Sequence, residues 1–222
     1  MTDSPDAAVR EQQPLSPEGP DDAAVSELDA QTRERRAAAL ARVRTFGDPV
    51  LKSRGTEVKG FGPELQGEVA EMISIMRDAL GVGLAATQLG IMHRLLVFQA
   101  GLDATPSAIV NPELEWLSDD LAIAIEGCLS LPGVTVEVER PLHARVRGRD
   151  PRGEPVLVEA SGLEARVLQH EIDHLDGVLI LDRTEREQRK GALRALREGE
   201  AYSPPSTDDD SHTEADRAPE EA

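Results

Sequence analysis

The residues best suited to do chemistry in this sequence are His170, Glu171 and His174. On a helix, the two histidines would project from one face, about 40° apart around the axis. Neutral imidazoles are common ligands of transition metals. Glu171 would lie about 60° beyond His174, where it can handle the proton of a metal-bound water without being a ligand itself. This spacing predicts a metal-dependent hydrolase.

A third ligand must come from elsewhere, and the only cysteine, Cys128, is the favoured residue. Gly127 lets the backbone approach closely, and a thiolate suits a borderline-soft ion. Three protein ligands leave one position open, which is typical of a catalytic site. Two alternatives stay open: an isolated cysteine is more often a buried apolar thiol, and a zincin-type metalloprotease would use a downstream acid. The downstream acids are Asp182, Glu185 and Glu187.

Helices and strands must bring these segments together, and the hydrophobic pattern predicts where they lie. Apolar residues share one helical face between residues 63 and 80, and the metal-binding helix is expected after a capping box at residues 161–164. A similar box at residues 184–187 predicts a last helix, and residues 24–43 predict a frayed one. Strands are predicted at residues 94–99, 107–114, 143–149 and 154–159, the last two as a hairpin.

This order of elements predicts an α+β fold. We expect mixed, mostly antiparallel strands packed around a central metal-binding helix, with an additional helix on the N-terminal side and a C-terminal helix.

Charge divides the chain into three parts. The formal net charge is −18, of which residues 1–23 contribute −5 and residues 203–222 contribute −6. Acidic ends with few large apolar residues cannot offset the entropy cost of ordering. The predicted organisation is an acidic extension at residues 1–40, disordered or partly helical, a catalytic domain at 41–199 and a disordered acidic tail at 200–222.

Composition also limits the cellular setting. A single cysteine excludes an internal disulfide, and 222 residues of which 39% are hydrophobic can form one domain with a real core. Neither a signal peptide nor an apolar run of membrane-spanning length is visible. We expect a cytoplasmic protein with no membrane or DNA partner.

Three stretches together resemble the signature sequences of peptide deformylases, in the same order. They are residues 81–88 (Gly-Val-Gly-Leu-Ala-Ala-Thr-Gln), 126–130 (Glu-Gly-Cys-Leu-Ser) and 169–175 (Gln-His-Glu-Ile-Asp-His-Leu). Taken alone, the first stretch is better explained as a helix stop followed by packing glycines. The resemblance implies removal of the formyl group from N-terminal formyl-methionine of nascent polypeptides, with release of formate.

The resemblance also implies roles for individual residues. Cys128, His170 and His174 would hold Fe²⁺, for which Zn²⁺, Ni²⁺ or Co²⁺ can substitute. Glu171 would carry the proton, and the Gln88 amide and the Leu129 N–H would stabilise the oxyanion. The residues expected to bind the substrate are Val82, Gly83, Glu126, Gly127, Leu163 and Val167.

Two positions depart from common members of that family, and one pair is shared with it. Ile125 replaces a frequent acid, and Arg166 lies where many members have an apolar residue. Glu126 and Arg140 match a pair that braces the site in the family; an ordinary surface ion pair is the alternative.

A basic segment near the end of the chain predicts a further partner. Residues 183–197 carry six basic and two acidic side chains, a net charge of +4 in an acidic protein. A solvated helix face explains this composition most simply. The alternative is contact with ribosomal RNA near the peptide exit, where the substrate would emerge.

Overall fold

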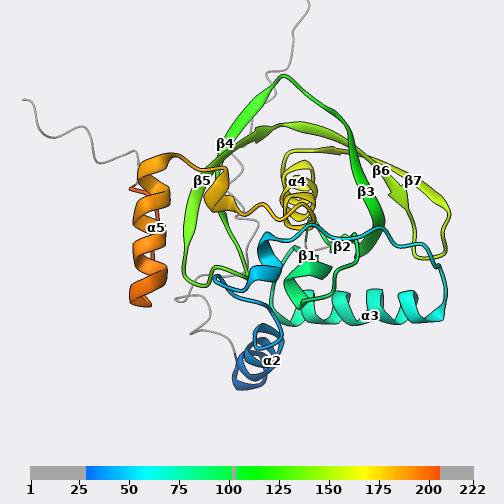
Figure 1. Cartoon of the computed structure of the whole chain (residues 1–222), viewed down its shortest axis with the longest axis horizontal. Coiled ribbons are helices and arrows are strands. Elements are labelled where there is room, and N and C mark those ends of the chain that lie inside the picture. Colours follow the sequence, from blue (N-terminus) through cyan, green and yellow to red (C-terminus); the bar gives the residue numbers. More distant parts are fainter. Residues whose placement is uncertain (1–28, 102–103, 206–222) are drawn as a thin grey trace, which may run out of the picture.

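The computed structural model describes residues 29–101 and 104–205 (Figure 1). Of the predicted acidic extension at residues 1–40 and the predicted acidic tail at residues 200–222, residues 1–28 and 206–222 lie outside the described residues. The α-helices are α2 (Ala30–Leu40), α3 (Pro63–Asp78), α4 (Leu163–Leu175) and α5 (Arg186–Glu198). Short 3₁₀ turns are η1 (Pro49–Lys52), η2 (Ala86–Leu89) and η3 (Ile180–Asp182). The strands are β1 (Gly83–Ala85), β2 (Leu95–Phe98), β3 (Ser107–Leu117), β4 (Leu121–Gly127), β5 (Thr135–Pro141), β6 (His143–Arg149) and β7 (Pro155–Ser161).

The strands form two antiparallel sheets, which confirms the predicted α+β class. One sheet has five strands in the order β1-β2-β3-β6-β7, and the other pairs β4 with β5. β6 and β7 form the predicted hairpin, in which Val146 lies opposite Val158. The β4–β5 sheet was not predicted from the sequence. It matters for the site because β4 ends one residue before Cys128.

Alternation along the strands divides the core between two helices. Leu95 and Val97 of β2 pack in a cluster with α3, whereas Leu96 and Phe98 pack in a second cluster with α4. Successive side chains of a strand point to opposite faces, so the five-stranded sheet is covered by α3 on one face and by α4 on the other. In Figure 1, α4 lies between this sheet and the β4–β5 sheet.

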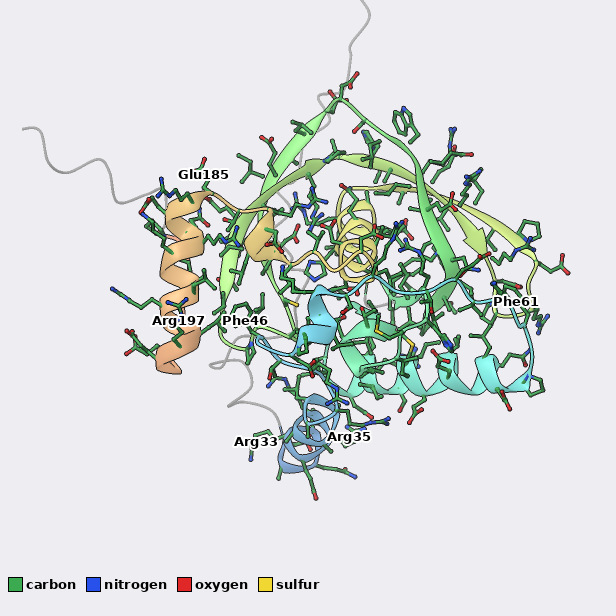
Figure 2. All side chains as sticks on the ribbon, in the orientation of Figure 1. Arg33, Arg35, Phe46, Phe61, Glu185 and Arg197 are labelled. Carbon is green, nitrogen blue, oxygen red and sulfur yellow. The ribbon has the colours of Figure 1, made fainter. Side chains whose placement is uncertain are left out.

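A third apolar cluster joins α5 to β5. Ala192 of α5 is buried with Val136 and Val138 of β5. The chain continues against the domain beyond the predicted start of the acidic tail at residue 200, because Tyr202 forms a parallel β-bridge with Val134. In Figure 2, α5 runs along the outer side of β5, with Glu185 at its start and Arg197 near its end.

The two predicted capping boxes are wrong, although both helices begin close to where they were predicted. Gly162 precedes α4 with a φ of 57° and no side-chain cap, while the hydroxyl of Ser161 bonds to His143. Glu185 precedes α5, also without a side-chain cap. None of the helices in the described ranges is both long and apolar enough to cross a membrane.

Candidate active site

Helix α4 carries the two histidines and is buried along almost its whole length. Every residue from Ala165 to Leu175 is buried, including His170, Glu171 and His174. Burying imidazoles and a carboxylate is costly unless each is hydrogen-bonded or binds a cation. This part of the helix therefore needs polar partners from neighbouring elements.

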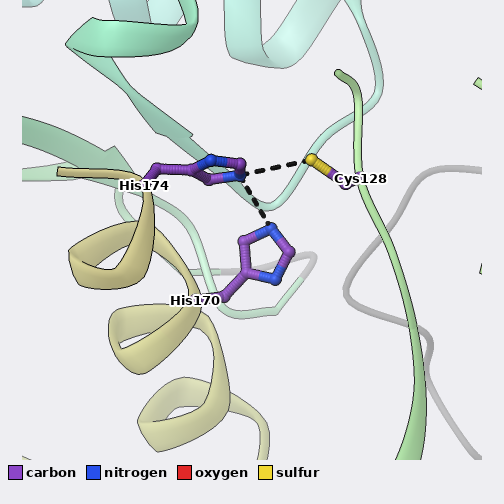
Figure 3. Close-up of side chains that lie close together, drawn as sticks. All are labelled: Cys128, His170 and His174. Atoms are coloured by element: carbon purple, nitrogen blue, oxygen red, sulfur yellow. Dashed lines mark hydrogen bonds between the residues drawn. The ribbon is translucent and has the colours of Figure 1, made fainter. Parts of the chain in front are cut away.

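Cys128, His170 and His174 converge on one point (Figure 3). His174 Nε2 lies 3.2 Å from Cys128 Sγ and 3.2 Å from His170 Nε2. All three candidate ligand atoms lie within 4.8 Å of one another. A tetrahedral site with metal–ligand bonds of about 2.0–2.3 Å keeps its ligand atoms roughly 3.3–3.6 Å apart. The donor set and the two distances of 3.2 Å therefore fit the binding of a divalent metal ion.

A buried carboxylate orients the first histidine. Glu126 Oε2 lies 2.9 Å from His170 Nδ1, which leaves the Nε2 atom of that ring facing Cys128 and His174. Arg140 binds the same carboxylate through two nitrogens, at 2.6 and 3.0 Å. A ligand histidine commonly donates its other ring N–H to such a carboxylate, which sets the tautomer and the orientation of the ring.

The Glu126–Arg140 pair is thus buried rather than a surface ion pair. The side chain of Glu126 is 0% exposed and that of Arg140 is 4% exposed. Arg140 also donates to Asp173 at 2.8 Å, and Arg183 binds Asp173 from the other side. Arg166 adds a second guanidinium on Glu126, at 2.6 Å. These arginines compensate the buried negative charge beside the histidines.

Burial and charge together shift the protonation equilibria at this site. Burial alone would raise the pKa of Glu126, but its hydrogen bonds with His170 and Arg140 hold that pKa well below its usual range. Burial alone would lower the pKa of His170, but hydrogen bonds with Cys128 and Glu126 raise it. Burial lowers the pKa of His174. A bound cation would displace a proton from the set formed by Cys128, His170 and His174, because thiolate and neutral imidazole are the forms that bind metals.

A small cleft opens beside these residues. It is lined by Gly81, Val82, Gly83, Gln88, Leu129, Val167, His170 and Glu171. Of the six residues predicted from the sequence to bind the substrate, three line the cleft: Val82, Gly83 and Val167. Glu126 lies behind His170, and neither Gly127 nor Leu163 is part of the cleft wall.

The Gln88 side chain is fixed with its amino group toward the sulfur of Cys128. Its Oε1 accepts a hydrogen bond from the Ala85 N–H at 2.9 Å, and a backbone N–H can only donate. Its Nε2 therefore faces Ser130 Oγ at 3.2 Å and Cys128 Sγ at 3.8 Å. Ser130 had no predicted role, although it lies in one of the three signature stretches.

Glu171 is pressed against the backbone of β1. A Cβ atom built on Gly83 would lie 2.8 Å from Cδ and 2.9 Å from Cγ of Glu171, so only glycine leaves room for this carboxylate. Burial raises the pKa of Glu171 to about 7. A carboxylate with a pKa near the working pH can both accept and return a proton.

Taken together, the fold and the site define the class of a metal-dependent hydrolase: a thiolate and two imidazoles for the ion, and a buried carboxylate beside them. Comparison with known proteins identifies the family. The family model for polypeptide deformylase matches residues 40–190. The chain therefore belongs to the polypeptide deformylase family.

Individual relatives agree with this assignment. Peptide deformylase of Acidothermus cellulolyticus is 46% identical over 162 residues, covering 73% of this chain and 88% of the relative. Peptide deformylase 1 of Corynebacterium glutamicum is 44% identical over 161 residues, covering 72% and 95%. The crystal structure of the Synechococcus elongatus enzyme in complex with actinonin matches with a TM-score of 0.67 and 40% identity, covering 72% of this chain and 88% of that one. Membership of this family disfavours the zincin-type metalloprotease.

Proposed function

We propose that this protein removes the N-formyl group from the N-terminal formyl-methionine of nascent polypeptides and releases formate. The observation that carries the proposal is the convergence of three ligand atoms within 4.8 Å, in a chain of the polypeptide deformylase family. Catalysis is assigned to residues 41–199, and the acidic ends are assigned to solubility or spacing.

Cys128, His170 and His174 would hold the metal ion. One thiolate and two imidazoles suit several first-row divalent ions, and the choice of Fe²⁺ in the cell follows from the resemblance to the family. When bound, the ion supplies Lewis acidity and makes a water nucleophilic at neutral pH. Anaerobically purified protein should be active with iron. Full activity with zinc together with inactivity with iron would contradict the choice of Fe²⁺.

Glu171 is the proposed proton carrier. It takes a proton from the attacking water and returns it to the leaving amine, a role supported by its place in the cleft and by a pKa of about 7. Negative charge that develops on the formyl oxygen would be met by the Gln88 amide and the Leu129 N–H. The Leu129 N–H donates no hydrogen bond to another described residue, so it is available to donate one to the formyl oxygen.

The substrate would lie with its methionine against apolar side chains. Val82 and Val167 line the cleft, and Leu163 packs beside them in the same apolar cluster. Gly83 and Gly127 are assigned backbone contacts to an extended peptide, since a glycine lets another chain approach closely. Glu126 supports the site through His170 rather than through the peptide.

The test is formate release from a formyl-Met peptide under anaerobic conditions. Glu171→Gln should lower the rate by about 10²–10⁴-fold with unchanged metal content, because it removes the proton carrier and leaves the ligands. Glu159→Gln, an exposed carboxylate on β7, is the matched control and should behave like the unmodified protein.

Unchanged formate release by Glu171→Gln would overturn the assignment of the proton carrier. Cys128→Ala tests the ligand set separately. Its metal affinity should fall steeply here, whereas a protease with a downstream ligand would keep it.

We further propose that α5 contacts the ribosome. Arg186, Lys190, Arg194 and Arg197 fall within about 80° of one another around the helix axis, on exposed positions. The apolar residues of the same helix are turned toward β5. Such a cationic stripe suits the phosphate backbone of RNA, with binding that weakens as salt rises. Nascent chains are made in the cytoplasm, where we place the reaction; a cysteine used as a thiolate ligand fits a reducing compartment.

Ribosome pelleting at several salt concentrations tests this contact. Replacing the four basic residues of the stripe with glutamine should weaken co-sedimentation and flatten its salt dependence. The same replacement of Arg145, Arg147 and Arg152, exposed or half-buried residues of β6 and the β6–β7 turn, is the control. Equal co-sedimentation of the α5 variant at low salt would contradict the proposal.

A further inference from the structure

Arg166 connects α4 by hydrogen bonds to both strands of the β4–β5 sheet. Its side chain is 8% exposed, and its guanidinium donates three hydrogen bonds. Nη2 reaches the carbonyl of Ala122 on β4 at 2.6 Å, and Nη1 reaches the carbonyl of Val138 on β5 at 2.9 Å. Nη1 also donates to Glu126 Oε1 at 2.6 Å. One buried side chain of α4 therefore ties together three acceptors from two strands.

Hydrogen bonds from Arg166 and His170 also hold the Glu126 carboxylate against α4, the helix that carries the histidines. Arg166 and His170 lie four residues apart, so their side chains share one side of α4. Arg166 binds Oε1 of Glu126 and His170 binds Oε2 through Nδ1, at 2.6 and 2.9 Å. Arg140, from β5, completes the set of donors with two bonds of its own. The carboxylate thus cannot rotate without breaking bonds at both oxygens.

Contacts of this kind matter because β4 has little apolar packing of its own. Leu121, Ile123 and Ile125 on its outer face are 54%, 64% and 41% exposed. The opposite positions are the small residues Ala122 and Ala124, which are half-buried. The side chains of β4 itself therefore add little apolar packing against α4, although β5, its ladder partner, is packed through the buried Val136 and Val138. The charge-assisted hydrogen bonds of Arg166 and Glu126 are the alternative, and such bonds are strong when buried.

The position of β4 decides where the sulfur ligand lies. β4 ends at Gly127, and Cys128 follows it directly, whereas His170 and His174 belong to α4. The distance of 3.2 Å between Cys128 Sγ and His174 Nε2 is therefore a distance between two separate elements. It holds only as long as β4 and α4 keep their mutual position.

We propose that Arg166 is a positioning residue of the metal site. It holds β4, and with it Cys128, at the separation from α4 at which the three ligands can bind one ion, and it keeps the Glu126 carboxylate on His170 Nδ1. The inference rests on the ligand set proposed above. Lysine cannot replace the guanidinium fully, because one ammonium lacks the planar fork that reaches acceptors on both strands.

The experiment measures how fast zinc- or cobalt-loaded protein gives up its metal to an excess of chelator. Arg166→Met should release metal about 10–100-fold faster than the unmodified protein, as expected for loss of a group that supports a ligand. Its kcat for formate release should fall on the order of 10-fold, with KM within about twofold. Arg166→Lys should lie between the two. Arg147→Met, which removes an exposed arginine paired with Glu113, should leave all three quantities unchanged.

Metal release separates a positioning role from a purely structural one. If Arg166→Met lowers the unfolding temperature but releases metal at the unmodified rate, Arg166 only braces the fold and the inference is wrong. If the methionine variant does not fold, Arg166→Lys decides: faster release supports the inference, and an unmodified rate overturns it.

Cys128→Ala, measured in parallel, identifies the source of a failure. If Cys128→Ala retains metal as well as the unmodified protein, the proposed ligand set is wrong. If only the Arg166 variants retain metal normally, the ligand set stands and the positioning role fails.

Discussion

Gly83→Ala perturbs the proposed proton carrier without touching a metal ligand. The added Cβ would lie 2.8 Å from the carboxyl carbon of Glu171, and nearer still to Oε1, whereas ordinary contact begins at 3.4 Å. Glu171 is buried, so its carboxylate can move only within the small cleft that it lines or against packed neighbours. The oxygen would be displaced on the order of 1 Å, and a misplacement of that size costs about 10²-fold in rate.

The assay is the kcat for formate release from a formyl-Met peptide, at matched metal content. We expect a loss of about 10²-fold in kcat, with metal retention close to that of the unmodified protein because Cys128 and both histidines are untouched. Gly60→Ala is the control, since a Cβ there meets nothing within 4 Å. An unchanged kcat for a fully metallated, folded Gly83→Ala protein would refute the reasoning that this carboxylate must stay where it lies.

Three further changes test other parts of the site and fold. Gln88→Leu should lower kcat by about 10²–10³-fold with normal metal content, by loss of an oxyanion donor; unchanged turnover would remove Gln88 from that role. Arg140→Met leaves the buried Glu126 with one cation fewer, so the free energy of unfolding measured with denaturant should fall by about 3–5 kcal/mol. A fall of less than about 1 kcal/mol would argue against the buried network. Burial raises the pKa of Asp182, but the hydrogen bonds from Lys52 and from the Leu179 N–H, together with the charge of Lys52, make the net shift downward. A carboxylate whose pKa is lower in the folded than in the unfolded chain stabilises the fold at pH values above the unfolded pKa of about 3.9. That stabilisation is lost as the pH falls through the pKa of the folded state. Lys52→Met should therefore lower the free energy of unfolding by on the order of 1 kcal/mol at neutral pH and at pH 5, and by less below pH 4. A loss that stays constant with pH would contradict this linkage.

The parts of the fold that could be predicted are those in which apolar residues face the core at a regular period. α3 follows the predicted apolar stripe, and the β6–β7 hairpin follows its turn residues. β5 carries a clear alternation as well, with Val136 and Val138 inward and Glu137 and Glu139 outward, so this strand could have been found. β4 reverses the rule, because its large side chains, such as Ile123, face outward and its alanines face inward.

The capping boxes failed for a related reason. Ser161 was expected to cap α4 because its type and spacing fit, but its hydroxyl bonds to His143 of the neighbouring strand instead. A glycine with a φ of 57° makes the turn into the helix. Residue type shows what a side chain can bind, and the choice among partners depends on which of them the fold brings near.

The sequence alone determined the chemistry of this protein: the four-residue spacing of the histidines, the glutamate between them and the single cysteine indicate a metal-dependent hydrolase. That chemistry is local, since helical periodicity alone places His170 and His174 on one face. The support of the site was decided only by the tertiary structure. Arg166 is 40 residues from Glu126 along the chain, and nothing in its local sequence shows that they meet at 2.6 Å. Contacts of this range depend on the packing of β4 against α4, which is a property of the folded chain as a whole.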